Sequence, residues 1–107
     1  MNGLIKIRSQ RSPNLYIPAA SIKEVSRSSA TQIAIITESV FMNRTGTFNA
    51  PGYLITETGT GGGATDETNV QAIIDAWTSV LRGQQSIATV NFPIVVDQVA
   101  RAMIAWP

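Results

Sequence analysis

The residues with the clearest chemical potential are glycines that stand between a predicted strand and a predicted helix. Gly59, Gly61 and Ala64 match the G-x-G-x-x-A pattern of dinucleotide-binding loops, in which glycines let main-chain amides approach a pyrophosphate. Asp66 and Glu67 follow where the phosphate would lie, no phosphate-loop lysine is present, and 107 residues are too few for a full doubly wound sheet. We therefore expect a strand-to-helix connection that binds no nucleotide or other cofactor.

Side chains suited to catalysis or metal binding are scarce. The chain has no cysteine and no histidine, which excludes disulfides, thiolate metal sites and the commonest general base. Its carboxylates, such as Glu57 and Asp66, lie in or beside predicted turns, without an apolar pocket of the kind that tunes a catalytic carboxyl group. The serines at positions 26, 28 and 29 have only Lys23 nearby as a base. These observations favour a protein that is not an enzyme, with no catalytic residue and no metal site.

Charge is distributed unevenly along the chain. The net charge is +1, yet the first 27 residues hold five basic residues and one acidic residue, so the remainder sums to −3. Ordinary solvated strand faces explain this polarity, and so do head-to-tail subunit contacts or a nucleic-acid face. Candidates for nucleic-acid binding are Lys6, Arg8 and Tyr16, which combine positive charge with an aromatic ring.

One amphipathic helix, expected over residues 66–82, organises the predicted fold. Thr68 and Gln71 have the spacing of a capping box, and Gly83 suits a left-handed helix stop. Trp77 is central on the apolar face, where we expect it to be buried against strands. The apolar residues repeat at helical spacing: Val70, Ile73, Ile74, Trp77, Val80 and Leu81.

Short apolar runs separated by turn residues predict strands in most of the remaining chain. Val96, Val99, Ala100 and Met103 repeat instead at helical spacing and predict a second, short helix near the C-terminus. The fold class is therefore α+β, in one compact domain of residues 1–107. We expect a small antiparallel sheet or partly open barrel of about five to six strands, packed by the main helix and the short C-terminal helix. The strand runs lie at residues 4–7, 15–17, 22–25, 33–36, 53–56 and 87–92.

Residues 38–52 mix apolar residues with turn residues and support two interpretations. As a long hairpin, the slightly favoured one, the segment places its aromatic residues in the core. As an insertion, it presents Phe41, Met42 and Phe48 as exposed anchors for a partner subunit. Trp106, close to the end of the sequence, is expected to dock on a surface. These four residues are the candidate interface residues.

No apolar run in the sequence is long enough to cross a bilayer. The first residues also lack the charged and then apolar order of a signal peptide. We therefore expect a soluble, unprocessed protein with no membrane partner.

Four stretches between residues 4 and 82 carry a resemblance of layout. They are Leu-Ile-Lys-Ile, Leu-Tyr-Ile-Pro-Ala-Ala-Ser-Ile-Lys-Glu-Val, Thr-Gln-Ile-Ala-Ile-Ile-Thr and Asn-Val-Gln-Ala-Ile-Ile-Asp-Ala-Trp. In this order they resemble small virion proteins of tailed phages, notably marine ones, and one type of flagellar regulator has a similar order of elements. The phage resemblance implies a minor capsid, decoration or connector protein, located in the virion and assembled in the host cytoplasm. The segment 41–50 and the elements after Gly83 depart from that layout.

Two functions from different classes remain open. The favoured one is a non-enzymatic structural protein of a phage particle, expected to form homo-oligomers or to pack against other virion proteins in the capsid or connector. The alternative is a small nucleic-acid-binding or nucleotide-binding module. Such a module calls for clustered basic residues or a complete phosphate loop, whereas a packing role suits a chain with few charges and many small polar residues.

Overall fold

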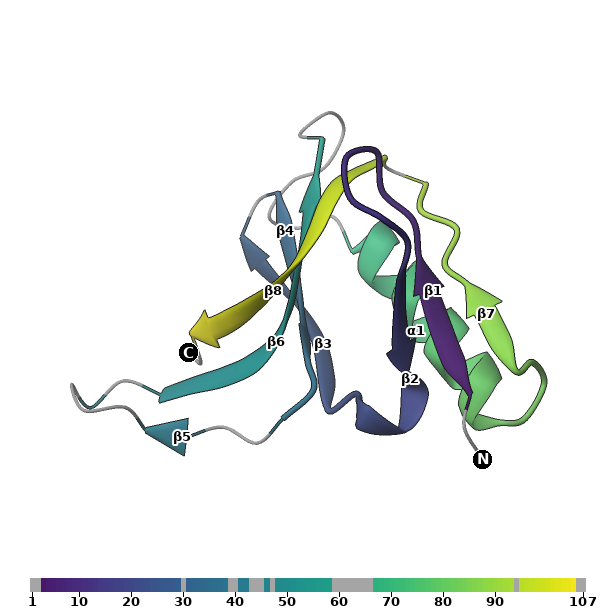
Figure 1. Cartoon of the computed structure of the whole chain (residues 1–107), viewed down its shortest axis with the longest axis horizontal. Coiled ribbons are helices and arrows are strands. Elements are labelled where there is room, and N and C mark those ends of the chain that lie inside the picture. Colours follow the sequence, from purple (N-terminus) through teal and green to yellow (C-terminus); the bar gives the residue numbers. More distant parts are fainter. Residues whose placement is uncertain are drawn as a thin grey trace.

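The computed structural model describes residues 3–29, 31–38, 41–42, 46, 48–58, 67–93 and 95–105 (Figure 1). Within that part of the chain, eight strands form two sheets, and one α-helix packs beside both of them. The elements in chain order are β1 (Leu4–Ile7), β2 (Leu15–Pro18), the 3₁₀ helix η1 (Ala19–Ser21), β3 (Glu24–Ser29), β4 (Gln32–Ile36), β5 (Phe41–Met42), β6 (Phe48–Glu57), α1 (Thr68–Leu81), β7 (Ile87–Thr89) and β8 (Val96–Ala105). The fold class is therefore α+β, as the sequence predicts.

The smaller sheet has three strands in the order β2-β1-β7. β1 pairs antiparallel with β2 and parallel with β7, and the parallel pair was not expected from the sequence. Successive side chains point to opposite faces of a strand, so Ile5 and Ile7 share one face, and both are 0% exposed. That face packs toward α1, while Leu4 and Lys6 lie on the outward face.

The larger sheet has five strands and is built around β6, which is ten residues long. β6 pairs antiparallel with β4 and, nearer its start, with β5; its other edge pairs antiparallel with β8. β3 pairs with β4 and completes the sheet. Gly52 lies where β4 and β6 approach closely, because a Cβ atom at this position would collide with the carbonyl oxygen of Ile35.

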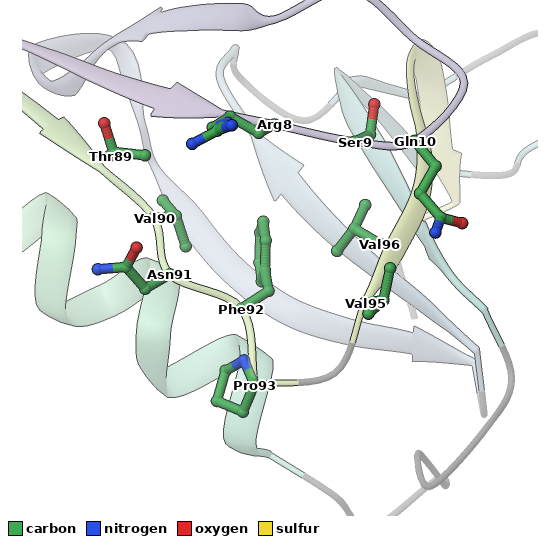
Figure 2. A pocket seen from close by; sticks show the side chains of 10 residues that line it. All are labelled: Arg8, Ser9, Gln10, Thr89, Val90, Asn91, Phe92, Pro93, Val95 and Val96. Carbon is green, nitrogen blue, oxygen red and sulfur yellow. The ribbon is translucent and has the colours of Figure 1, made fainter.

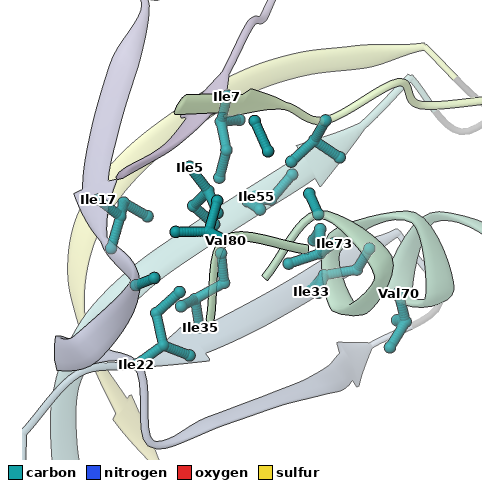
Figure 3. Packing of buried hydrophobic residues seen from close by; sticks show 14 of the residues in the cluster. Ile5, Ile7, Ile17, Ile22, Ile33, Ile35, Ile55, Val70, Ile73 and Val80 are labelled. Atoms are coloured by element: carbon teal, nitrogen blue, oxygen red, sulfur yellow. The ribbon is translucent and has the colours of Figure 1, made fainter. Parts of the chain in front are cut away.

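The main hydrophobic core lies where α1 and the two sheets meet (Figure 3). It consists mainly of β-branched side chains, which suit packed strand surfaces. Its members include Ile5, Ile7, Ile17, Ile22, Ile33, Ile35, Ile55, Val70, Ile73 and Val80. A second, smaller cluster lies on the opposite face of the larger sheet and includes Ala34, Ile36, Ala50 and Ile104.

The ends of α1 agree with the sequence in one respect and differ in another. Gly83 has a φ of 75°, a left-handed conformation that glycine adopts without steric cost, so the predicted stop is confirmed. The capping box is not formed: Glu67, and not Thr68, is the N-cap residue, and the side-chain Nε2 of Gln71 donates to Asp75 Oδ1 at 2.8 Å. No helix in the described ranges is long and apolar enough to cross a membrane.

Trp77 lies at the margin of the apolar face of α1, not at its centre. The side chain is partly buried, and its indole N–H donates to the carbonyl oxygen of Ala19 in η1 at 2.9 Å. The centre of the face is formed by smaller residues such as Ile73 and Ala76. The ring therefore fixes η1 to the helix and packs against the main core, but it is partly and not fully buried, which corrects the predicted burial.

The predicted short C-terminal helix is also wrong, because residues 96–105 form strand β8. Val96, Val99 and Met103 do have helical spacing, but the segment pairs with β6 along almost its whole length. Both faces of β8 carry apolar side chains, which hides the two-residue period of a strand. The described strands number eight instead of about five or six, and the two sheets do not close into a barrel.

Candidate functional site

Three of the four candidate interface residues, Phe41, Met42 and Phe48, lie on β5 and at the start of β6. The two residues of β5 pair antiparallel with the first two residues of β6, which agrees with the hairpin interpretation. Met42 is nevertheless 62% exposed, as the anchor interpretation predicts. The side chains of Phe41 and Phe48, and the whole of Trp106, lie outside the described part of the structure.

The first half of β6 and the second half of β8 extend beyond the body that α1 and the smaller sheet form (Figure 1). We call this region, residues 41–42, 48–53 and 101–105, the arm. Met103 on the arm is 57% exposed. The guanidinium group of Arg101 lies 5.4 Å from the ring centroid of Tyr53, and its Nη2 is 2.9 Å from Glu38 Oε2. This ion pair is itself largely exposed, so the arm presents much of its surface to solvent.

The outer edge of β8, the edge that faces away from β6, is covered along its first half. The connection between β1 and β2 lies against it: Arg11 N–H donates to the Asp97 carbonyl oxygen at 2.9 Å, and Val99 N–H donates to Ser12 Oγ at 3.2 Å. The Arg11 guanidinium also donates to both carboxylate oxygens of Asp97, at 2.9 and 2.6 Å. This hydrogen bonding and the charge of Asp97 raise the pKa of Arg11 above its ordinary value.

The second half of that outer edge is open. The main-chain N–H and C=O groups of successive residues point to alternate edges of a strand. The N–H of Val99 points away from β6, so the main-chain groups of Arg101, Met103 and Ala105 do so as well. The hydrogen bonding of β6 is consistent with this direction. Pro51 lies opposite Met103, and its carbonyl oxygen accepts a bond from the N–H of Thr37, on the edge of β6 that faces away from β8. Among the residues that the structure describes, no strand or loop pairs with the outer edge of β8 after Val99.

One face of the sheet at the arm is apolar and combines alanine with isoleucine side chains. Ala50 and Ile104 on the arm pack with Ala34 and Ile36 on β4, and all four are almost fully buried. The arm therefore combines a small apolar cluster with an open main-chain edge. These are the features by which strands add to the edge of a sheet.

A buried ion pair lies at the other end of β6. Arg27 donates Nη1 to Glu57 Oε1 at 2.8 Å and Nη2 to Oε2 at 3.3 Å, and the two side chains are 6% and 0% exposed. Asn69, in the first turn of α1, donates Nδ2 to Glu57 Oε2 at 2.8 Å. The cluster ties β3, β6 and α1 together. A carboxylate neutralised in this way holds structure and is poorly placed to act as a general base.

Glu57 was expected beside a turn in water, and its burial corrects that prediction. The sequence does contain a pattern from which the ion pair could have been predicted. Ile55 and Glu57 share one face of β6, and Val25 and Arg27 share one face of β3, so each charge follows an apolar residue on the same face. When the inward face of a strand ends in a charged residue, an opposite charge or donor is required there, because a buried lone charge is costly.

The three nucleic-acid candidates lie close to one another on the smaller sheet. Lys6 and Tyr16 are cross-strand partners on its outward face, with Lys6 Nζ 5.8 Å from the ring centroid, and Tyr16 is 47% exposed. Arg8 follows the end of β1 and lines a surface hollow of about 540 Å³ together with Asn91 and Phe92 (Figure 2). We call Lys6, Arg8 and Tyr16 the basic patch.

The glycine pattern at Gly59, Gly61 and Ala64 lies outside the described residues, as does Asp66. Glu67 is described and is the N-cap residue of α1, without a side-chain capping bond. No group of three or more acidic side chains that could hold a metal ion occurs among the residues that the structure describes.

Comparison of the chain with family models, with curated proteins and with solved structures found no match. The arm, the buried ion pair and the basic patch are therefore the features on which a functional argument rests.

Proposed function

We propose that the chain is a non-enzymatic structural protein of a phage particle, which packs against other copies or other virion proteins in the capsid or connector. The phage setting is supported by the layout that residues 4–82 share with small virion proteins. The mode of action is supported by one observation above all, the open outer edge of β8 on the arm.

An open strand edge favours association with another strand, because its N–H and C=O groups can form main-chain hydrogen bonds with that strand. Any other contact that removes water from these groups would leave them without hydrogen bonds, at a cost in free energy. Proteins that stay monomeric usually protect such edges with prolines, charges, bulges or short strands. The other described border strands of this fold have these devices: β2 ends in Pro18, β3 carries Glu24 and a bulge after Arg27, β5 has two residues, and β7 has three residues. The open part of β8 carries one charge, Arg101, and residues 102–105, which are Ala, Met, Ile and Ala, have no charge, proline or bulge.

Sedimentation velocity across a concentration series tests the proposal. We expect species larger than the monomer, in a proportion that rises with concentration. Replacing both exposed methionines of the arm, Met42→Ser with Met103→Ser, should reduce association. The matched control is Ile87→Ser, because Ile87 is 50% exposed but lies on the smaller sheet. A chain that remains monomeric at every concentration, and also when mixed with the other proteins of the particle, would refute the proposal.

The basic patch favours a second candidate function, binding of single-stranded nucleic acid. An exposed aromatic ring beside a cation is a unit on which a base stacks while the backbone is neutralised, although Tyr16 is a single ring. Fluorescence anisotropy with a labelled oligonucleotide separates the two functions. Binding that weakens with salt and disappears in Tyr16→Ala supports this candidate, and absence of binding at low salt rejects it.

A further inference from the structure

The open edge of β8 is complementary to itself, and we propose that it pairs with the same edge of a second copy, antiparallel and about a two-fold axis. In this arrangement Met103 lies directly opposite Met103 of the second copy. The inference rests on the proposed assembly function, because it names the partner that the arm takes.

The register follows from the three residues whose main-chain groups point outward. Directly opposite residues of this kind in an antiparallel pair exchange two N–H···O bonds. With Met103 at the centre, Arg101 of one copy lies opposite Ala105 of the other. Every outward group of the three residues then has a partner, which gives about six intermolecular hydrogen bonds.

Neighbouring registers are less favourable. Moving the second copy by two residues in one direction places Ala105 opposite Val99, where the β1–β2 connection already occupies the edge. Moving it in the other direction leaves Arg101 of each copy opposite no residue of β8, which ends at Ala105, so about four of the six hydrogen bonds form. A shift by one residue places the outward groups opposite residues whose main-chain groups bond to β6, so the outward groups have no partners.

Charges and side-chain sizes also fit a second copy. The two Arg101 residues would lie four positions apart along the strands, about 14 Å, which exceeds the screening length at physiological salt. Each Arg101 also keeps Glu38 of its own chain at 2.9 Å. On the apolar face, Ile104 of one copy lies opposite Ala102 of the other, so a large side chain meets a small one and the two apolar clusters join.

The strand contact alone is smaller than the roughly 1,200–2,000 Å² of a typical stable interface. We therefore expect a weak dimer in dilute solution, which becomes stable when many such contacts act together in an assembly. A method that traps weak dimers is the appropriate test.

Because the chain has no cysteine, an introduced cysteine reports a single contact. Opposed residues of a hydrogen-bonded pair have Cα atoms about 5.5 Å apart, within the range of a disulfide. Met103→Cys should therefore form a covalent dimer under mild oxidation. Arg101→Cys alone and Ala105→Cys alone should cross-link little, whereas a mixture of these two variants should form the mixed dimer.

A second experiment separates main-chain pairing from side-chain contact. Met103→Pro removes an outward N–H that the chain does not use internally, so the monomer should keep its fold, which circular dichroism and urea unfolding would verify. We expect dimerisation to weaken about ten-fold or more in Met103→Pro, and only about two- to three-fold in Met103→Ala, which keeps the N–H.

The outcomes distinguish this inference from the function on which it rests. Self-association that persists in Met103→Pro, or that cross-links through Arg101→Cys alone, overturns the register but leaves the assembly function in place. Cross-linking of Met103→Cys to another virion protein, without self-dimers, overturns the choice of a second copy. A chain that neither self-associates nor binds virion proteins overturns both.

Discussion

Replacing Glu57 by alanine should destabilise this fold more than changes at exposed charges do. The substitution removes the carboxylate that neutralises the Arg27 guanidinium, which is 6% exposed, and it removes the acceptor of the Asn69 Nδ2 bond. Arg27 cannot lose its charge at ordinary pH, so the charge stays buried beside an apolar gap. The cost therefore combines electrostatic desolvation with a lost buried hydrogen bond.

Removing one partner of a buried ion pair costs about 3–5 kcal/mol. A domain of this length has a total unfolding free energy of about 5–15 kcal/mol. The variant should thus lose at least about a fifth of the stability, and about two fifths for middle values of both ranges. With a urea dependence of about 1–3 kcal/mol per molar for small proteins, the unfolding midpoint should fall by about 2 M.

Equilibrium urea unfolding followed by circular dichroism measures this shift. The matched control is Glu38→Ala, since the Glu38–Arg101 pair has a similar distance, 2.9 Å, but side chains that are 56% and 60% exposed. Exposed pairs contribute about 1 kcal/mol or less, so the control should unfold near the wild-type midpoint. The double variant Arg27→Met with Glu57→Leu should recover much of the loss, because no charge then remains buried. Equal midpoints for Glu57→Ala and the wild type would refute the reasoning.

Two further predictions concern packing. Gly52→Ala should force β4 and β6 apart, because the new Cβ atom meets the carbonyl oxygen of Ile35; we expect a large fall in Tm by calorimetry, and an unchanged Tm would contradict the close approach. Trp77→Phe keeps an aromatic ring but removes the donor to Ala19, so it should cost about 1 kcal/mol in urea unfolding, and Trp77→Ala should cost clearly more. If both Trp77 variants unfolded like the wild type, the contact between α1 and η1 would contribute nothing to stability.

The main helix could be predicted from the sequence because its information is local. Apolar residues such as Ile73 and Val80 repeat with the helical period, and Gly83 supplies the conformation that ends the helix. The position of Trp77 could not be predicted in the same way. Its place depends on η1, whose carbonyl oxygen receives the indole N–H from a segment 58 residues away in the chain.

The division into two sheets could not be predicted from the sequence pattern, because it depends on pairing between strands that are far apart in the chain. β1 and β7 are joined in parallel through Leu4 opposite Ile87, and no local feature encodes that choice. The prediction of a helix at the residues of β8 was wrong for a related reason. Its alanines and valines fit either period, and only the presence of a long partner strand decides between helix and strand.

The candidate site was predictable only in part. The mixed pattern around Met42 left two interpretations open, and the exposed side chain of Met42 agrees with the less favoured one, an exposed anchor. The open edge has no sequence signal, because it exists only where β8 borders the sheet and where the β1–β2 connection stops covering it. Residues of ordinary type thus become candidate interface residues through topology.

β6 links the two features that carry these expectations, and it separates them in space. Its last residue, Glu57, lies in the buried ion pair, whereas Pro51 is opposite Met103 on the arm. Changes near Glu57 remove partners of buried groups that water does not reach, so they lower the free energy of unfolding. Changes at the outer edge of β8 alter main-chain groups that water satisfies in the monomer, so they act on association. If Met103→Pro lowered monomer stability as much as Glu57→Ala does, the outer edge of β8 would be in use within the chain, and the arm would be part of the folded core and not a surface for assembly.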